Sequence, residues 1–236
     1  RRGRPTANLL WDNKSSVLVG DYLFARSFQL MTETNNMRVL AILANASATI
    51  AEGEVLQLTA AQNLATDEQV YLQVVRGKTA ALFSAATEVG GVISDAPEDQ
   101  VTALYDYGDA LGIAFQIVDD SLDVIGDPET VGKSLGTDLA NGKMTLPIIR
   151  LRDGLDSRQR EALLALLGNH KNSGSNMEFH HELVRWLGES EIFEQVQESA
   201  RQAILRAIEL LQQTAPKCQA RDHLEQLALF VIEREL

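Results

Sequence analysis

Cysteine, proline and long apolar runs are all scarce in this 236-residue chain. The single cysteine, Cys218, excludes an internal disulfide framework and is typical of a reducing compartment, so we expect a cytoplasmic protein. No uninterrupted apolar run approaches the roughly 18 residues that a membrane-spanning helix needs, and no charged-then-apolar leader stands at the start. The sequence therefore predicts a soluble protein with no transmembrane segment.

Basic residues are also fewer than acidic ones. The chain has 21 Lys and Arg residues against 33 Asp and Glu residues, which gives a formal net charge of -12. Such a chain repels nucleic acid and anionic membranes unless its basic residues gather locally. We therefore expect no nucleic-acid partner, and any polyanionic ligand has to find a local basic site.

Helical periodicity recurs in segment after segment, whereas alternating β-branched runs are few and only 5 prolines interrupt the chain. The sequence predicts an all-α fold, and its length and 45% hydrophobic content allow one domain over residues 1–236. The first expected helix is apolar around much of its circumference, so we expect it to be central. The expected helices span 15–31, 36–58, 66–94 and 97–125, then one that begins at 145 and others within 179–236, broken near 215–216.

Three carboxylates directly follow the apolar stretch "LGIAFQIV". Asp119 and Asp123 share a helix face and Asp120 lies on its flank, so all three can converge. The carbonyls at a helix end already carry partial negative charge, so such a cluster needs a cation, and carboxylate oxygens suit Mg²⁺ together with substrate phosphates. The alternative is a solvated helix end, but the apolar stretch predicts burial up to the edge of the triplet.

Lysines follow the carboxylates. Lys133 and Lys143 lie in a Gly-rich segment that can fold back over the helix end, and ammonium groups bind phosphate oxygens as point charges. Metal and lysines together would hold a diphosphate; the alternative is that these are surface lysines that balance nearby acids. Upstream, Lys78 and Thr79 open "KTAALFSAA", where a polar pair on a small, apolar helix either faces solvent or lines a cavity.

Other polar residues carry weaker signals. His180 and His181 point about 100° apart on a helix and lack a third ligand at helical spacing, which favours a surface or core role. Cys218 forms no recognisable nucleophile set with His170 or His223.

The order of several motifs resembles the trans-isoprenyl diphosphate synthases, the polyprenyl synthetase family. The resemblance covers most of residues 1–150, and the last third of the chain matches mainly in helical character. It implies an all-α bundle with a central cavity, an active homodimer, and Mg²⁺-dependent condensation of isopentenyl diphosphate with an allylic diphosphate to give a trans-polyprenyl diphosphate of medium or long chain. The matching motifs are "RRGRPTANLLWDNKSSVLVGDYLFA", "EGEVLQL", "GKTAALF", "FQIVDDSLD" and the "GK…GTD…GK" series.

The resemblance also assigns roles to residues. The aspartates become the second Asp-rich motif, which binds the metal, and Asp119 is the expected direct ligand. Contacts to the allylic diphosphate are implied for Lys78, Thr79, Lys133, Lys143 and Arg1. Contacts to isopentenyl diphosphate are implied for Arg2, Phe115 and Gln116, and second-layer or water-mediated roles for Gln57 and Asp138.

The start of the chain departs from this family. The first residues are Arg1 and Arg2, and the family's first Asp-rich motif, with its basic cluster, would lie upstream of them. A basic run at a chain end is by itself expected to be solvated. We therefore expect an N-terminally truncated polyprenyl synthetase domain with little activity of its own. A class I terpene cyclase and a non-catalytic subunit of a heteromeric synthase stay open as alternatives.

Overall fold

Helices make up the fold. The structure is a computed structural model that describes residues 4–61, 63–125, 138, 141–170, 177–188 and 190–233, leaving aside the side chains of 166, 168–170 and 177–182; no strand occurs among them. The all-α prediction is confirmed. The elements are α1 (Ala7–Leu10), α2 (Asn13–Glu33), α3 (Met37–Ala60), α4 (Glu68–Val75), the π-helical turn η1 (Arg76–Ala80), α5 (Ala81–Ile93), α6 (Glu98–Ile125), α9 (Leu146–Gly154), α10 (Ser157–His170), α11 (Met177–Gly188), α12 (Ile192–Thr214) and α13 (Gln219–Glu233).

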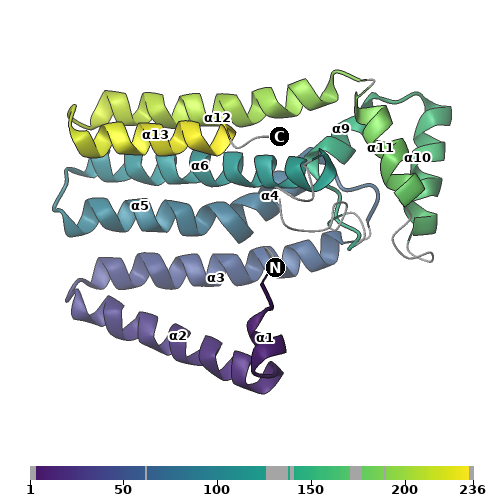
Figure 1. Cartoon of the computed structure of the whole chain (residues 1–236). Helices are drawn as coiled ribbons and strands as arrows, with labels where there is room; N and C mark the ends of the chain where they lie inside the picture. Colours follow the sequence, from purple (N-terminus) through teal and green to yellow (C-terminus); the bar gives the residue numbers. More distant parts are fainter. Residues whose placement is uncertain are drawn as a thin grey trace.

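The long helices lie side by side in layers, with α12 and α13 at one side and α2 at the other (Figure 1). Helix α6 packs between α12 and α5, and α3 packs on α5 and η1. The shorter α9, α10 and α11 gather at one end of the layers, the end where α4 also lies (Figure 1). This end therefore brings together segments that are far apart in the sequence.

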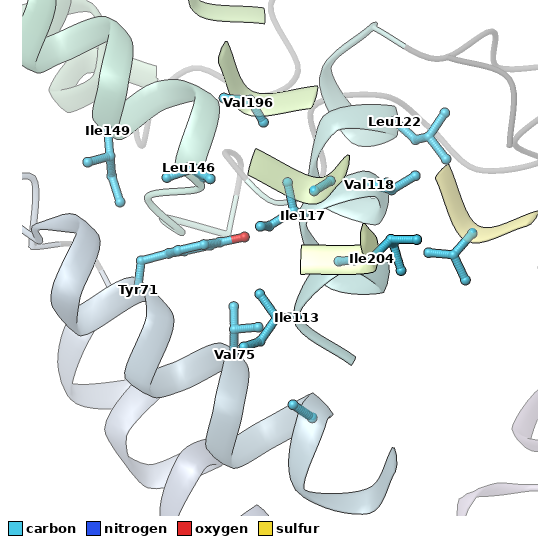
Figure 2. Packing of buried hydrophobic residues seen from close by; sticks show 14 of the residues in the cluster. Tyr71, Val75, Ile113, Ile117, Val118, Leu122, Leu146, Ile149, Val196 and Ile204 are labelled. Atoms are coloured by element: carbon cyan, nitrogen blue, oxygen red, sulfur yellow. The ribbon is translucent and has the colours of Figure 1, made fainter. Parts of the chain in front are cut away.

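Helix α6 is buried on nearly all sides, as the apolar stretch "LGIAFQIV" predicted. Leu111, Ile113, Ile117 and Val118 are buried, and burial continues through the helix to Val124. Figure 2 shows Ile113 and Ile117 on the side of α6 that faces Tyr71 and Val75 of α4, and Val118 on the opposite side. Side chains of α9 and α12 complete the cluster. The end of α6 is thus surrounded by protein rather than solvated.

Side-chain caps define where several helices begin. The Asp12 carboxylate accepts the Ser15 N–H at 2.6 Å at the start of α2, and Asp67 accepts the Val70 N–H at 2.8 Å at the start of α4. Such caps satisfy N–H groups that have no partner inside the helix. The loop between α3 and α4 therefore ends in a capped helix start.

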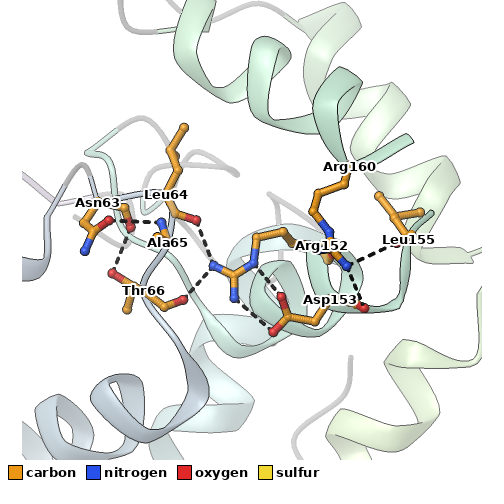
Figure 3. Close-up of polar contacts among 8 residues, drawn as sticks. All are labelled: Asn63, Leu64, Ala65, Thr66, Arg152, Asp153, Leu155 and Arg160. Carbon is orange, nitrogen blue, oxygen red and sulfur yellow. Dashed lines mark hydrogen bonds and ion pairs between the residues drawn. The ribbon is translucent and has the colours of Figure 1, made fainter. Parts of the chain in front are cut away.

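A buried arginine anchors the loop between α3 and α4. Arg152 of α9 is 7% exposed and donates to the carbonyl oxygens of Leu64 at 2.8 Å and Thr66 at 2.7 Å, while Asp153 pairs with its other face (Figure 3). Nearby, Arg160 donates to the Arg152 carbonyl at 3.0 Å. Because these donors replace water around buried carbonyl groups, they fix the loop against α9.

The expected central place of the first long helix is wrong. Helix α2 is the outermost layer, and Met31 is its one buried residue. Its apolar residues do surround the helix, but the described chain covers few of them. The exposed large side chains are those of Val17, Leu18, Val19, Tyr22, Leu23, Phe24, Phe28 and Leu30.

One described helix has the length and composition of a membrane-crossing segment. Helix α3 has 24 residues, and its most apolar 18-residue window has a mean hydropathy of 1.4. Length and composition alone do not separate such a helix from one that packs in a water-soluble protein. The expected absence of a transmembrane segment stays a prediction.

Candidate functional site

A pocket opens where α3, α4, η1, α6 and the segment before α9 meet. It holds about 580 Å³ of space, including the solvent at its mouth. Several polar residues predicted for the site meet here, although they come from distant parts of the sequence. These are Gln57, Lys78, Thr79, Gln116, Asp120 and Lys143.

The turn η1 supplies the first pair of polar residues. Lys78 extends toward α3, where its Nζ lies 3.2 Å from Gln57 Oε1 and 3.1 Å from Glu54 Oε1. The Thr79 hydroxyl donates to Gln116 Oε1 at 2.8 Å. Of the two readings that the sequence left open for this pair, the cavity-lining one is confirmed.

Helix α6 supplies a buried carboxylate that continues this chain of hydrogen bonds. Gln116 Nε2 donates to Asp120 Oδ1 at 2.8 Å, and the Tyr71 hydroxyl donates to Asp120 Oδ2 at 2.7 Å. Thr79, Gln116, Asp120 and Tyr71 therefore form one continuous network along the pocket wall. Such a network orients each member through its neighbours.

Burial dominates the electrostatics of this carboxylate. Asp120 is 4% exposed, and burial raises its pKa to about 7, although the donors Tyr71 and Gln116 and the charge of Lys143 oppose the shift. Burial also raises the pKa of Tyr71 well above its usual value, and the neighbouring Asp120 charge raises it further. The Asp120 carboxylate therefore binds a proton more readily than a solvent-exposed carboxylate does.

The chain returns over the end of α6 at Asp138. The Asp138 N–H donates to Asp123 Oδ2 at 2.9 Å, and the Asp138 carboxylate pairs with Lys143. Burial lowers the pKa of Lys143, but the hydrogen bond and charge of Asp138, with the charges of Asp120 and Asp123, raise it overall. Lys143 thus lies in the pocket as an ammonium group, as the expected fold-back of this segment requires.

The expected convergence of the three carboxylates stays a prediction. Asp120 binds Tyr71 and Gln116, Asp123 binds the Asp138 backbone, and Asp119 is half-buried. Within the described ranges, no three Asp, Glu, His or Cys side chains gather as a metal site. Adjacent aspartates on a helix point about 100° apart, so Asp119 and Asp120 leave the helix in different directions.

Some of the residues predicted for the site do not line this pocket, or are not among the residues that the structure describes. Phe115 packs on Phe83 of α5, with ring centroids 5.5 Å apart, beside the pocket. Arg1, Arg2 and Lys133 lie outside the described residues, as do the side chains of His180 and His181. Cys218 is exposed.

Two residues of the site were missed by sequence reasoning. Tyr71 precedes Lys78 by seven residues, two helical turns, so the spacing could have placed it on the same stripe. Glu54 precedes Gln57 by three residues and could likewise have been placed beside it. The sequence could not have paired either residue with its partner, because Asp120, the partner of Tyr71, and Lys78, the partner of Glu54, each lie on a different helix.

The sequence is similar to proteins of one known family. A family model described as "Polyprenyl synthetase" matches residues 1–184. The chain is 45% identical over 163 residues to the all-trans-nonaprenyl-diphosphate synthase (geranyl-diphosphate specific) of Rhodobacter capsulatus, which covers 69% of this chain and 50% of that protein. The chain therefore spans about half the length of this curated relative.

Solved structures share the fold. A decaprenyl diphosphate synthase from Rhodobacter capsulatus is 56% identical with a TM-score of 0.89, covering 99% of this chain and 71% of that one. A polyprenyl synthase from Caulobacter crescentus CB15, complexed with calcium and isoprenyl diphosphate, is 40% identical with a TM-score of 0.89, covering 100% and 71%. Together with the family model, which matches well over half of the residues, these similarities mean that the chain belongs to the polyprenyl synthetase family.

Proposed function

We propose that the protein is a Mg²⁺-dependent prenyltransferase that condenses isopentenyl diphosphate with an allylic diphosphate and releases a trans-polyprenyl diphosphate of medium or long chain. One observation carries this proposal: Lys78, Thr79 and Lys143 meet the buried carboxylate of Asp120 in one pocket of a chain whose net charge is -12. A diphosphate is the ligand that uses both kinds of group, the ammonium groups directly and the carboxylates through a divalent cation.

The cationic side of the pocket would bind the allylic diphosphate. Lys78 and Lys143 are both partly exposed, each with 31% of its side chain accessible, so each ammonium group can reach a ligand. Their present partners, Glu54 and Asp138, hold them at the pocket edge. Lys133 and Arg1 are proposed to add contacts to the same diphosphate.

Carboxylate oxygens on α6 fit a hard divalent cation by their chemistry. Both oxygens of Asp120 accept hydrogen bonds from protein groups, and Asp123 holds the Asp138 backbone. Asp119, Asp120 and Asp123 are proposed to hold Mg²⁺ together, with Asp119 as the direct ligand. When bound, Mg²⁺ would neutralise charge on the leaving diphosphate. The Caulobacter relative was solved with calcium and isoprenyl diphosphate, which supports a divalent cation here.

In the proposed reaction, the allylic C–O bond breaks and its electron pair leaves with the diphosphate. The double bond of isopentenyl diphosphate attacks the allylic carbon, and loss of a proton restores a double bond in the product, which is five carbons longer. Lys78, Thr79 and Lys143 stabilise the charge that develops on the leaving group. Arg2, with Phe115 and Gln116, is proposed to hold isopentenyl diphosphate.

The exposed apolar residues of α2 support a homodimer. Leu18, Tyr22, Leu23 and Phe24 are each more than half exposed on neighbouring turns. Apolar patches of this extent mark interaction surfaces, and a two-fold interface would cover the same patch on both copies. We propose that the enzyme acts as this dimer in the cytoplasm, where the single cysteine stays reduced.

The decisive experiment assays the full-length natural protein with isopentenyl diphosphate, an allylic diphosphate and Mg²⁺. Chain-elongated diphosphate is expected, and Asp119→Ala should lower its rate by about 10²–10³ because preorganised charge at the diphosphate is lost. Asp106→Ala, on an exposed site of the same helix, is the matched control. Asp119→Ala activity within a few-fold of wild type would contradict the assignment.

The same assay separates the alternatives. Release of free diphosphate without any need for isopentenyl diphosphate would indicate a terpene cyclase. Activity that requires a second, different chain would indicate a subunit of a heteromeric synthase.

A further inference from the structure

The turn η1 changes the phase of the helix that carries it. The buried positions of α4 are Tyr71 and Val75, and regular α-helical spacing would bury residues 78, 79 and 82 next. The structure instead buries Ala80 and Ser84 and leaves Leu82 exposed. The N–H of Ala81 bonds to the Arg76 carbonyl, the five-residue bond of a π-helix, so one extra residue fits into this turn.

The phase change has a direct effect on the pocket. Lys78 and Thr79 stay on the stripe that faces the pocket, as a continuation of α4. Downstream of the turn, the small residues Ala80 and Ser84 take over the contact with α6. A regular helix would place the polar pair where Ala80 now packs. The π-turn therefore separates a polar, ligand-facing stripe from a close-packed one.

Two glycines enclose this turn from opposite sides. A Cβ atom added at Gly53 of α3 would lie 2.6 Å from the Lys78 backbone nitrogen and 2.8 Å from the Gly77 carbonyl carbon. A Cβ atom added at Gly112 of α6 would lie 2.5 Å from the Cα of Ala80. These clashes are with backbone atoms, which cannot rotate away as a side chain can. Only glycine allows α3 and α6 to contact the turn this closely.

We infer that Gly53 and Gly112 are positioning residues, which hold the π-turn from both sides and so aim Lys78 and Thr79 into the pocket. This inference rests on the proposed diphosphate-binding role of that pair. Neither glycine lines the pocket. A methyl group at either position would displace the backbone of the turn. The Lys78 ammonium group and the Thr79 hydroxyl would then move with that backbone.

Matched pairs of variants test the inference in the full-length natural protein. Gly112→Ala crowds the turn. Gly108→Ala crowds the contact of α6 with α5 one turn farther from the pocket, with Thr87 Oγ1 at 2.5 Å and atoms of Phe83 and Ser84 at 2.6 Å. Gly77→Ala and Gly91→Ala form a milder pair, because each added Cβ would have its nearest neighbour at 3.1 Å. The milder pair decides the matter if a severe variant does not fold.

Two quantities are measured for each variant: the melting temperature, and the Kd for inorganic pyrophosphate with Mg²⁺ by calorimetry. Gly112→Ala and Gly77→Ala should raise Kd by about tenfold or more, because a charge-assisted contact is lost. Gly108→Ala and Gly91→Ala should lower the melting temperature as much as their partners do, yet change Kd by less than about twofold.

The outcomes are distinguishable. Equal rises of Kd in both members of a pair would overturn the inference, since general loosening would then explain them. Unchanged Kd in both site variants would also overturn it, while pyrophosphate binding by the wild type would leave the proposed function standing. If the wild type does not bind pyrophosphate, the proposed function fails, and the inference fails with it.

Discussion

The Tyr71 hydroxyl donates a 2.7 Å hydrogen bond to Asp120 Oδ2 and so ties α4 to α6 inside the pocket wall. Removing this hydroxyl leaves one oxygen of a buried carboxylate without its donor. Tyr71→Phe should lower the free energy of unfolding by about 1–3 kcal/mol. Urea titration measures the change. Tyr105→Phe is the control, because Tyr105 of α6 is 46% exposed. An equal effect of the two substitutions would contradict the role of the bond.

The pKa of Asp120 makes stability depend on pH in a definite direction. Its folded-state pKa of about 7 lies above the unfolded value of 3.8, so the folded protein binds a proton more tightly between those values. This contribution is fully present below about pH 4 and is lost as pH rises through about 7. Asp120→Asn should therefore weaken the decline in stability over this window.

The measurement is urea unfolding at several pH values between about 4 and 8, in the presence of a chelator. The wild type should lose a few kcal/mol more than Asp120→Asn over this window, since each pKa unit corresponds to about 1.4 kcal/mol. Identical slopes for the two proteins would show that Asp120 does not titrate in this range.

Arg152 is expected to matter more for stability than any exposed arginine. Arg152→Met removes the donors of the Leu64 and Thr66 carbonyl groups, which leaves buried acceptors unsatisfied. The expected cost is about 3 kcal/mol, measured by chemical unfolding. Arg158→Met, at an exposed site on α10, should stay within about 0.5 kcal/mol of wild type. A small effect at Arg152 would mean that water replaces the guanidinium.

The proposed dimer depends on the apolar surface of α2. Phe24→Glu places a charge in the patch that also holds Phe28, whose ring lies 5.1 Å from that of Phe24. Burying an unpaired charge is costly, so the variant should shift the full-length protein from dimer to monomer. Light scattering coupled to size exclusion gives the mass, and Lys14→Glu, near the start of the same helix, is the control. A dimeric Phe24→Glu variant would exclude this face from the interface.

Much of the fold could be predicted from the sequence because periodicity and capping are local. The limits of α3 and α6 fall within a few residues of their predicted ranges, and the buried end of α6 follows from its apolar run. The place of α2 could not be predicted, since an apolar helix reads the same whether its own chain or another molecule covers it.

The site could be predicted in part. Motif order picked out residues such as Lys78 and Lys143, which the structure brings into one pocket. The different hydrogen-bond partners of Asp120 and Asp123 could not be predicted, because helical spacing does not say which neighbour each carboxylate meets. The π-turn could not be predicted either. Ala80 and Ser84 are recognised as the buried positions after the turn only from their contact with α6 in the structure.

The hydrogen bond from Arg152 to the Thr66 carbonyl has a consequence for folding during synthesis on the ribosome. Thr66 lines the pocket, and its donor Arg152 is translated 86 residues later. At about 5–20 residues per second, a nascent chain spends about 4–17 s with Thr66 already made and Arg152 still to come. We expect the pocket wall to close only when α9 docks, so pulse-labelled nascent chains should gain protease resistance around Thr66 after α9 has left the exit tunnel.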